Sequence, residues 1–143
     1  MVVVIPAYQP DEKLVRVVHD LHEQSDYDII IVNDGSDKDR LPIFESLEPY
    51  AKVLTHEVNR GKGAALKTAL SYIYEQYPAD EGVVTIDADG QHLPADVIRV
   101  SEAWEQAPEK LVLGSREFKG NVPFKSRAGN AITRCVFAAS TGV

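Results

Sequence analysis

Short continuous runs of β-branched residues alternate along this chain with longer segments of helical periodicity. The runs Val2–Ile5 and Ile29–Val32 are apolar at every position, which is typical of parallel strands covered on both faces of a sheet. Between them, apolar side chains recur at helical spacing from Leu14 to Leu21. Because strands joined by helices form mostly parallel sheets, this alternation predicts a sheet with helices packed on both faces.

The expected elements alternate regularly along the whole sequence. We predict strands over residues 2–5, 27–32, 51–55, 83–86 and 111–114, helices between consecutive strands, and a last helix over residues 128–142. The predicted fold is therefore α/β, with three layers in the order helix, sheet, helix. With 143 residues, the chain is expected to form a single domain over residues 1–143.

Composition restricts the classes of function. A net charge of −7 without a basic run argues against nonspecific binding to nucleic acid. The single cysteine, Cys135, cannot form an internal disulfide, which suits a reducing, cytoplasmic setting. We expect no signal peptide, because Met1 leads directly into an apolar strand, and no window reaches the apolar length of a membrane span.

Polar side chains follow the predicted strands. Those that we consider functional are Tyr8, Asp34, Asp87, Asp89, Ser115 and Arg116. Ligands of such sheets bind beyond the carboxyl ends of the strands, so these residues predict one site. Asp87 and Asp89 stand one residue apart, where they suit a hard cation that is shared with substrate phosphates. The plain alternative is an ordinary Asp/Gly turn at a strand end.

Three familiar phosphate-binding patterns do not match this chain. A dinucleotide-binding Rossmann fold needs G-x-G-x-x-G directly after the first strand, where this chain has Pro6-Ala7-Tyr8. Gly61-Lys62-Gly63 lacks the length and the hydroxyl residue of a P-loop. A phosphatase with an aspartyl nucleophile would carry its D-x-D-G motif on an early strand, whereas here the motif follows the fourth.

Four motifs occur in order on the expected elements. They are Val3-Val4-Ile5-Pro6-Ala7-Tyr8, Val32-Asn33-Asp34-Gly35-Ser36, Asn59-Arg60-Gly61-Lys62-Gly63-Ala64-Ala65 and Asp87-Ala88-Asp89-Gly90-Gln91-His92. Together they resemble the family 2 glycosyltransferases, which have the GT-A fold. The last motif is similar to that of the polyprenyl-phosphate subgroup, which is related to dolichyl-phosphate mannose synthase. Residues 114–116 and 127–130 resemble two later elements of that subgroup.

The resemblance implies a metal-dependent, inverting glycosyltransferase. Its donor would be a UDP- or GDP-sugar and its acceptor a polyprenyl phosphate or a glycan, as in the biosynthesis of cell-envelope polysaccharides or glycolipids. The resemblance implies Mg²⁺ or Mn²⁺ at Asp89 and Gln91, with Asp87 and Asp89 as catalytic carboxylates. The residues expected to bind the nucleotide sugar are Pro6, Ala7, Tyr8, Asp34, Lys62, Asp87 and Ala88. Arg116 and Arg127 are expected to bind an anionic acceptor, because guanidinium groups match phosphate oxygens.

These assignments have structural alternatives. Tyr8 is alternatively a partly buried aromatic residue at a strand end, and Asp34 a turn or helix-cap residue. Lys62 is alternatively a solvated lysine, and Arg116 and Arg127 are alternatively surface residues that form ion pairs.

We expect that the carboxyl end is truncated, because the last predicted helix stops at Val143 without a closing strand. The full-length protein is then expected to act at the inner face of the cell membrane, with further acceptor elements and membrane-associated helices after this point. Two alternatives stay open. One is a nucleotide-sugar binding fragment without turnover. The other is a sugar-1-phosphate nucleotidyltransferase, which would need a Gly-rich, Arg-containing loop where this chain has Pro6-Ala7-Tyr8-Gln9-Pro10.

Overall fold

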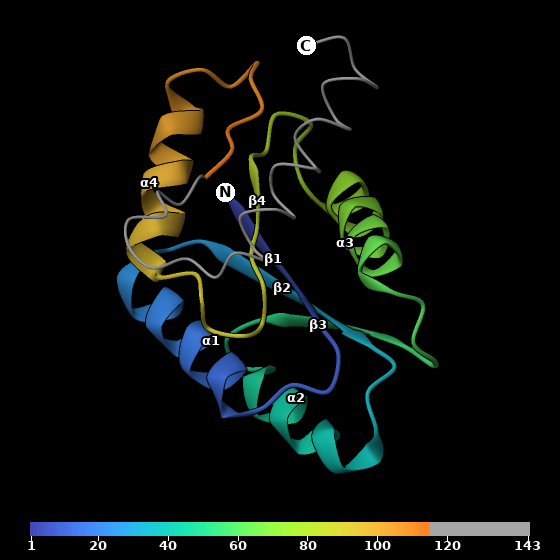
Figure 1. The fold of residues 1–143 in the computed structure, drawn as a ribbon. Helices are drawn as coiled ribbons and strands as arrows, with labels where there is room; N and C mark the ends of the chain where they lie inside the picture. Colours follow the sequence, from blue (N-terminus) through green and yellow to red (C-terminus); the bar gives the residue numbers. More distant parts are fainter. Residues whose placement is uncertain (115–143) are drawn as a thin grey trace, which may run out of the picture. The chain divides into compact units, whose positions relative to one another are not determined.

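The computed structural model describes residues 1–114, and Met1–Leu113 form one compact unit (Figure 1). The elements in order are β1 (Val2–Ala7), α1 (Glu12–Gln24), β2 (Asp28–Asp34), the 3₁₀ helix η1 (Lys38–Arg40), α2 (Leu41–Leu47), β3 (Lys52–His56), α3 (Lys62–Gln76), β4 (Val83–Thr85) and α4 (Pro94–Glu105). Ser115, Arg116, Arg127, Cys135 and the predicted helix over residues 128–142 lie outside the described residues. The single domain predicted over residues 1–143 extends past this unit and stays a prediction.

The four strands form one sheet in the order β3-β2-β1-β4, and every neighbouring pair is parallel. This confirms the predicted parallel sheet. The chain adds β2 and β3 on one side of β1 and then returns to add β4 on the other side. The strand order therefore reverses between β1 and β4, and at such a switch point an open α/β sheet binds its ligands.

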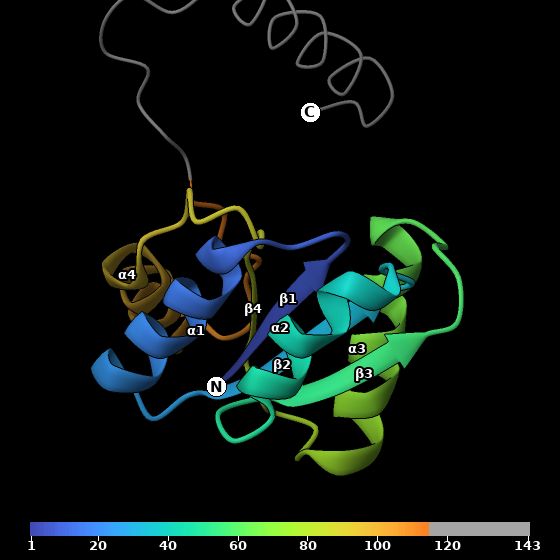
Figure 2. The same cartoon turned by 90° about the horizontal axis from the view of Figure 1, so that it is seen from below.

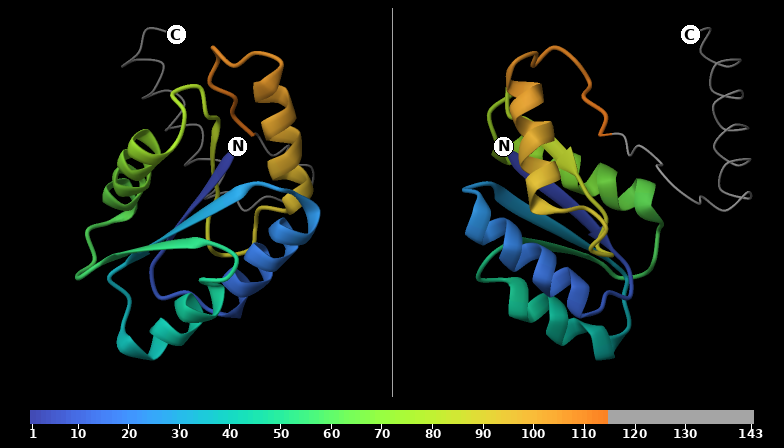
Figure 3. Two further views of the ribbon diagram at one scale, coloured as in Figure 1. Left: turned by 180° about the vertical axis from the view of Figure 1, so that it is seen from behind. Right: turned by 60° about the vertical axis from the view of Figure 1, so that its left-hand side comes forward.

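Successive side chains of the central strands point to opposite faces and supply two separate cores. Val3 and Ile5 of β1 pack with the buried residues of α1, α2 and α4. Val2 and Val4 pack on the other face against Ala65, Ala69 and Ile73 of α3. Figures 2 and 3 show α3 and the other helices on opposite faces of the sheet. The three-layer α/β fold is thus confirmed, since an apolar strand run needs cover on both faces.

The segments that enter and leave the helices have the local signals that their geometry requires. The Asp11 carboxylate accepts a hydrogen bond from the Lys13 N–H and caps the start of α1. Pro94 occupies the first turn of α4, where its missing N–H costs nothing. Among the residues that the structure describes, no helix has both the length and the hydropathy that crossing a membrane requires.

The strand predicted over residues 111–114 is absent, and the sheet of the described part of the chain ends at β4. After α4, the Lys110 N–H donates to the Ala107 carbonyl in a turn, and the chain continues without a ladder partner. Leu111 and Leu113 are 86% and 78% exposed. An apolar run this short forms a strand only where a neighbour supplies both hydrogen bonds and burial, and residues 1–114 provide neither for it.

Candidate active site

The carboxyl ends of β1, β2 and β4 meet at one edge of the sheet. Ala7 at the end of β1 lies opposite Asn33 in β2. On the other side of β1, the Ile86 N–H donates to the Val4 carbonyl, so the ladder reaches the residue before Asp87. The segments that follow β1, β2 and β4 are distant in the sequence and are brought to one edge of the sheet.

The loops after β1 and β2 are joined by a hydrogen bond. The Gln9 N–H donates to Ser36 Oγ at 3.0 Å, and the Ser36 N–H donates to Asn33 Oδ1 at 2.9 Å. Gln9 has a φ of 51°, a left-handed conformation that a non-glycine residue adopts at some cost. Tyr8 precedes it and is 54% exposed. The loop therefore presents the Tyr8 ring to solvent at the edge of the sheet, while Ala7 is buried and Pro6 is half-buried.

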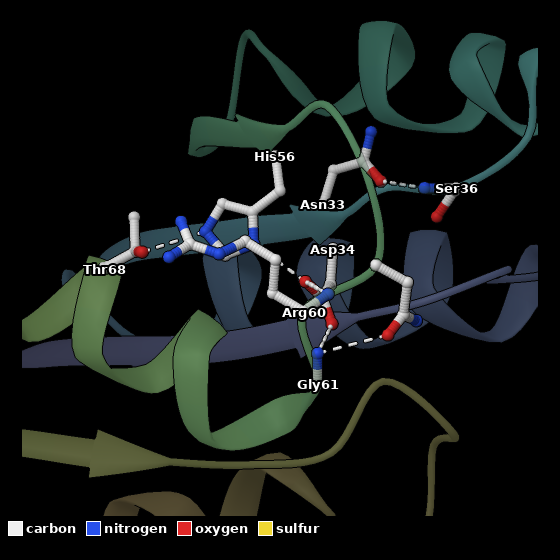
Figure 4. Close-up of polar contacts among 8 residues, drawn as sticks. Asn33, Asp34, Ser36, His56, Arg60, Gly61 and Thr68 are labelled. Atoms are coloured by element: carbon white, nitrogen blue, oxygen red, sulfur yellow. Dashed lines mark hydrogen bonds and ion pairs between the residues drawn. The ribbon is translucent and has the colours of Figure 1, made fainter.

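Asp34, the last residue of β2, is 3% exposed and bonded through both carboxylate oxygens (Figure 4). Its Oδ1 accepts from the Arg60 N–H at 2.9 Å and lies 2.7 Å from His56 Nδ1. Its Oδ2 accepts from the Gly61 N–H at 2.8 Å. Burial is the largest effect on this carboxyl and raises its pKa, but the hydrogen bonds from Arg60, His56 and Gly61 together outweigh it. The pKa of Asp34 therefore lies below its ordinary value of 3.8.

We expect Asp34→Asn to reduce the free energy of unfolding by about 1.5–3 kcal/mol at neutral pH, because an amide nitrogen would face an N–H donor. A carboxyl whose pKa is lowered by folding contributes stability above its unfolded pKa, and this contribution is lost as the pH falls through the folded pKa. The difference between parent and variant should therefore stay constant from about pH 7 to about pH 5 and shrink below about pH 3.8. Urea unfolding across this range measures it, and a difference that is independent of pH would contradict the assignment.

Lys62 at the start of α3 forms an ion pair with Asp87 after β4. Lys62 Nζ lies 2.5 Å from Asp87 Oδ1, and His92 Nε2 lies 3.8 Å from Asp87 Oδ2. The hydrogen bond from Lys62 is the largest cause that lowers the pKa of the Asp87 carboxyl, ahead of the opposing effect of burial. Both side chains are about half exposed, so the pair adds little stability and is open to exchange with a charged ligand.

Asp89 is exposed on the turn that follows, and its Oδ1 accepts from the Gln91 N–H at 2.9 Å. Gly90 turns the chain with a φ of 74°. Within residues 1–114 no three His, Cys, Asp or Glu side chains gather as a metal cage. Mg²⁺ in phosphate sites takes one or two carboxylates and completes its coordination with water and phosphate oxygens. Asp89 and the neighbouring Gln91 fit a cation that is shared with a substrate, and they do not fit a closed structural metal site.

Sequence reasoning missed His56 and Thr68. His56 is 8% exposed and lies opposite Asp34 in the β2–β3 register, and its Nε2 is 2.8 Å from Thr68 Oγ1. The predicted third strand stopped at Thr55, one residue before this histidine. The available signal was an acid at one strand end and a histidine at the next, which a parallel register brings side by side. The proposed acceptor residues Arg116 and Arg127 lie outside the described residues.

Comparison with known proteins gives one family. The profile described as glycosyl transferase family 2 matches residues 2–138. The chain is similar to a UDP-N-acetylglucosamine–dolichyl-phosphate N-acetylglucosaminyltransferase of Methanococcus voltae, with 35% identity over 89% of this chain and 57% of that protein. An uncharacterized protein of Methanocaldococcus jannaschii is 32% identical over 90% of this chain and 53% of its own length. The chain therefore spans about half the length of the curated relatives that it matches.

Solved structures show the fold. Residues 1–349 of TarS from S. aureus give a TM-score of 0.58 at 19% identity, covering 83% of this chain and 39% of that one. A 4-diphosphocytidyl-2C-methyl-D-erythritol synthase gives a TM-score of 0.60 at 12% identity, covering 85% and 66%. These likenesses confirm the three-layer GT-A fold and, at such identities, carry no further conclusion.

Proposed function

The chain belongs to glycosyl transferase family 2, and from this premise we propose that it binds a nucleotide-diphosphate sugar at the carboxyl edge of its sheet, for transfer of the sugar to a lipid phosphate. The observation that carries the proposal is the Lys62–Asp87 pair. It joins the start of α3 to the end of β4 beside the exit of β1, where the strand order reverses.

On the donor side, the proposal assigns Pro6, Ala7 and Tyr8 to the base and ribose, with the exposed Tyr8 ring as a stacking face. Asp34 contributes to the donor side indirectly. Its carboxylate oxygens accept hydrogen bonds from the backbone N–H groups of Arg60 and Gly61, which directly precede Lys62.

The charged residues form the diphosphate end of the proposed site. The Lys62 ammonium group neutralises the Asp87 carboxylate. A diphosphate that enters the site would compete with Asp87 for the positive charge of Lys62. Asp87 and Ala88 would then lie beside the sugar and its phosphates. Asp89 and Gln91 would hold a Mg²⁺ or Mn²⁺ ion, which when bound supplies positive charge to the leaving diphosphate.

Transfer requires that the bond between the anomeric carbon and the donor phosphate oxygen breaks while an acceptor oxygen forms a new bond from the opposite face. A phosphate acceptor already carries a negatively charged oxygen, so it needs no general base to remove a proton. This suits a site whose acids Asp87 and Asp89 are assigned to the donor and the cation. The proposed acceptor contacts are Arg116 and Arg127. If the acceptor is a membrane lipid, the reaction takes place at the inner face of the membrane.

Calorimetric titration of the chain with UDP-N-acetylglucosamine and GDP-mannose tests the proposal. We expect one of them to bind in the presence of Mn²⁺ and to bind at least about tenfold more weakly after chelation with EDTA. A chain that binds neither nucleotide sugar with Mn²⁺ would contradict the proposal. Binding without transfer to a polyprenyl phosphate would identify the chain as a donor-binding fragment.

A further inference from the structure

A buried histidine at the end of β3 is hydrogen bonded through both ring nitrogens. His56 Nδ1 lies 2.7 Å from Asp34 Oδ1, and Nε2 lies 2.8 Å from Thr68 Oγ1 on α3. Because an ionised carboxylate can only accept, His56 donates a hydrogen bond from Nδ1. In this tautomer of the neutral ring, Nε2 accepts a hydrogen bond from the Thr68 hydroxyl. One side chain thus joins β2, β3 and α3 (Figure 4).

Asp34 connects this histidine to the loop that precedes α3. Its two oxygens accept from the N–H groups of Arg60 and Gly61, at 2.9 and 2.8 Å. The bond from His56 restricts rotation of the carboxylate, so that both oxygens stay directed at the two amides.

The beginning of the same loop packs against the turn after β2. A Cβ atom at Gly35 would lie 2.2 Å from the Val58 carbonyl carbon and 2.3 Å from the Asn59 nitrogen, so the two backbones are in direct contact there. The loop is therefore held at its beginning by a backbone contact and at its end by Asp34.

The end of this loop determines where the charged pair at the sheet edge lies. Gly61 caps α3, and its carbonyl accepts from the N–H groups of Ala64 and Ala65. Lys62 follows directly and reaches Asp87. A displacement of Gly61 would therefore displace Lys62.

We infer that His56 is a positioning residue of the proposed donor site. Through Asp34 it holds Arg60 and Gly61, and with them Lys62, where they meet Asp87 and a nucleotide sugar. The part that concerns the donor rests on the proposed function, whereas the part that concerns the loop does not. Stability alone is a poor test, because removing one partner of a buried polar pair destabilises a protein whether or not that partner positions a binding site.

Three variants divide the network into its parts. His56→Leu removes both hydrogen bonds. His56→Asn keeps an amide N–H near the position of Nδ1 and can rescue the contact with Asp34. Thr68→Val removes the hydroxyl and keeps the shape of the side chain. His22→Leu is the matched control, because His22 is an exposed histidine that contacts the Tyr50 ring and not this network.

Two measurements follow on each variant. The first is amide hydrogen exchange at Arg60 and Gly61 by NMR, and the second is calorimetric affinity for UDP-N-acetylglucosamine and GDP-mannose with Mn²⁺. In His56→Leu we expect exchange at both amides to rise about tenfold or more and donor affinity to fall about tenfold. Exchange within β1 should stay unchanged, which separates release of the loop from general loss of stability. Thr68→Val should shift both readouts in the same direction by less, and His56→Asn should restore most of the loss.

The outcomes separate the two proposals. Unchanged exchange at Arg60 and Gly61 in His56→Leu would overturn the inference, as would released amides with unchanged donor affinity. If His56→Leu does not fold, the inference is tested with His56→Asn and Thr68→Val, by amide exchange at Arg60 and Gly61 and by donor affinity. If the parent chain binds neither nucleotide sugar, the proposed function fails, and the exchange rates alone decide whether His56 positions the loop.

Discussion

Asp89→Ala is expected to weaken metal-dependent binding of a nucleotide sugar by about a hundredfold or more, while the melting temperature stays unchanged. Asp89 is exposed on the turn after β4, and its Oδ1 accepts one backbone N–H within that turn. Loss of this bond costs little stability, because solvent replaces it at an exposed site. In the proposed site, loss of the carboxylate removes an anionic ligand of the cation that is shared with the diphosphate.

Calorimetry with Mn²⁺ present and after chelation measures the effect on Asp89→Ala. The matched control is Asp96→Ala, which removes an exposed aspartate from the first turn of α4, where it pairs with Arg99 at 3.3 Å. The control should bind the donor like the parent chain. If Asp89→Ala keeps the metal-dependent affinity of the parent, the cation is bound elsewhere and the assignment of Asp89 is wrong.

Gly35→Ala is expected to destabilise the chain by about 3 kcal/mol or more. Gly35 has a φ of 70°, where a side chain is strained, and its Cβ would overlap the backbone of Val58 and Asn59. Backbone cannot rotate away as a long side chain can, so the turn after β2 and the loop before α3 must separate. Donor affinity should fall together with stability, because that loop leads to Lys62.

Two other glycines in the same region provide matched controls for Gly35→Ala. Gly63 lies inside α3 with open space around its Cβ position, so Gly63→Ala should be neutral or stabilise by up to about 1 kcal/mol. Gly61 has open space around its Cβ position, but its φ of 87° and ψ of 155° lie in a region that is essentially confined to glycine. Gly61→Ala should therefore lose stability through backbone strain alone, by about 1–3 kcal/mol. Chemical denaturation of the three variants measures the order. Equal losses at Gly35 and Gly61 would show that the close approach of the two backbones contributes nothing.

The fold was predictable because its signals are local and repeated. Val2–Ile5 and Ile29–Val32 are apolar at every position, and a strand of that kind is stable only between two covering layers. The prediction failed over residues 111–114, where an apolar run has no neighbouring strand within the described part of the chain and its leucines are exposed. A short apolar run carries no information about whether a partner strand is available, and this depends on the rest of the sheet.

The candidate site was predictable only as a set of motifs at strand exits. The sequence indicated that Asp34 and Asp87 belong to one edge, because the ends of parallel strands meet there, and the family resemblance added Lys62 to the site. The sequence did not indicate which groups form hydrogen bonds or ion pairs with each of these charged side chains. The Asp34 carboxylate is bonded internally to His56, Arg60 and Gly61, while Lys62 reaches across the edge of the sheet to Asp87.

The sequence by itself determined the alternation of strands and helices, the parallel sheet, and the edge at which the polar motifs collect. These follow from the periodicity of the side chains within each segment and from the order of the segments along the chain, and both can be read directly from the sequence. Only the tertiary structure decided that His56 lies beside Asp34 and that Gly35 touches the loop before α3. Hydrogen bonds and close backbone contacts depend on register and on ångström distances between segments remote in sequence, and no local pattern encodes these distances.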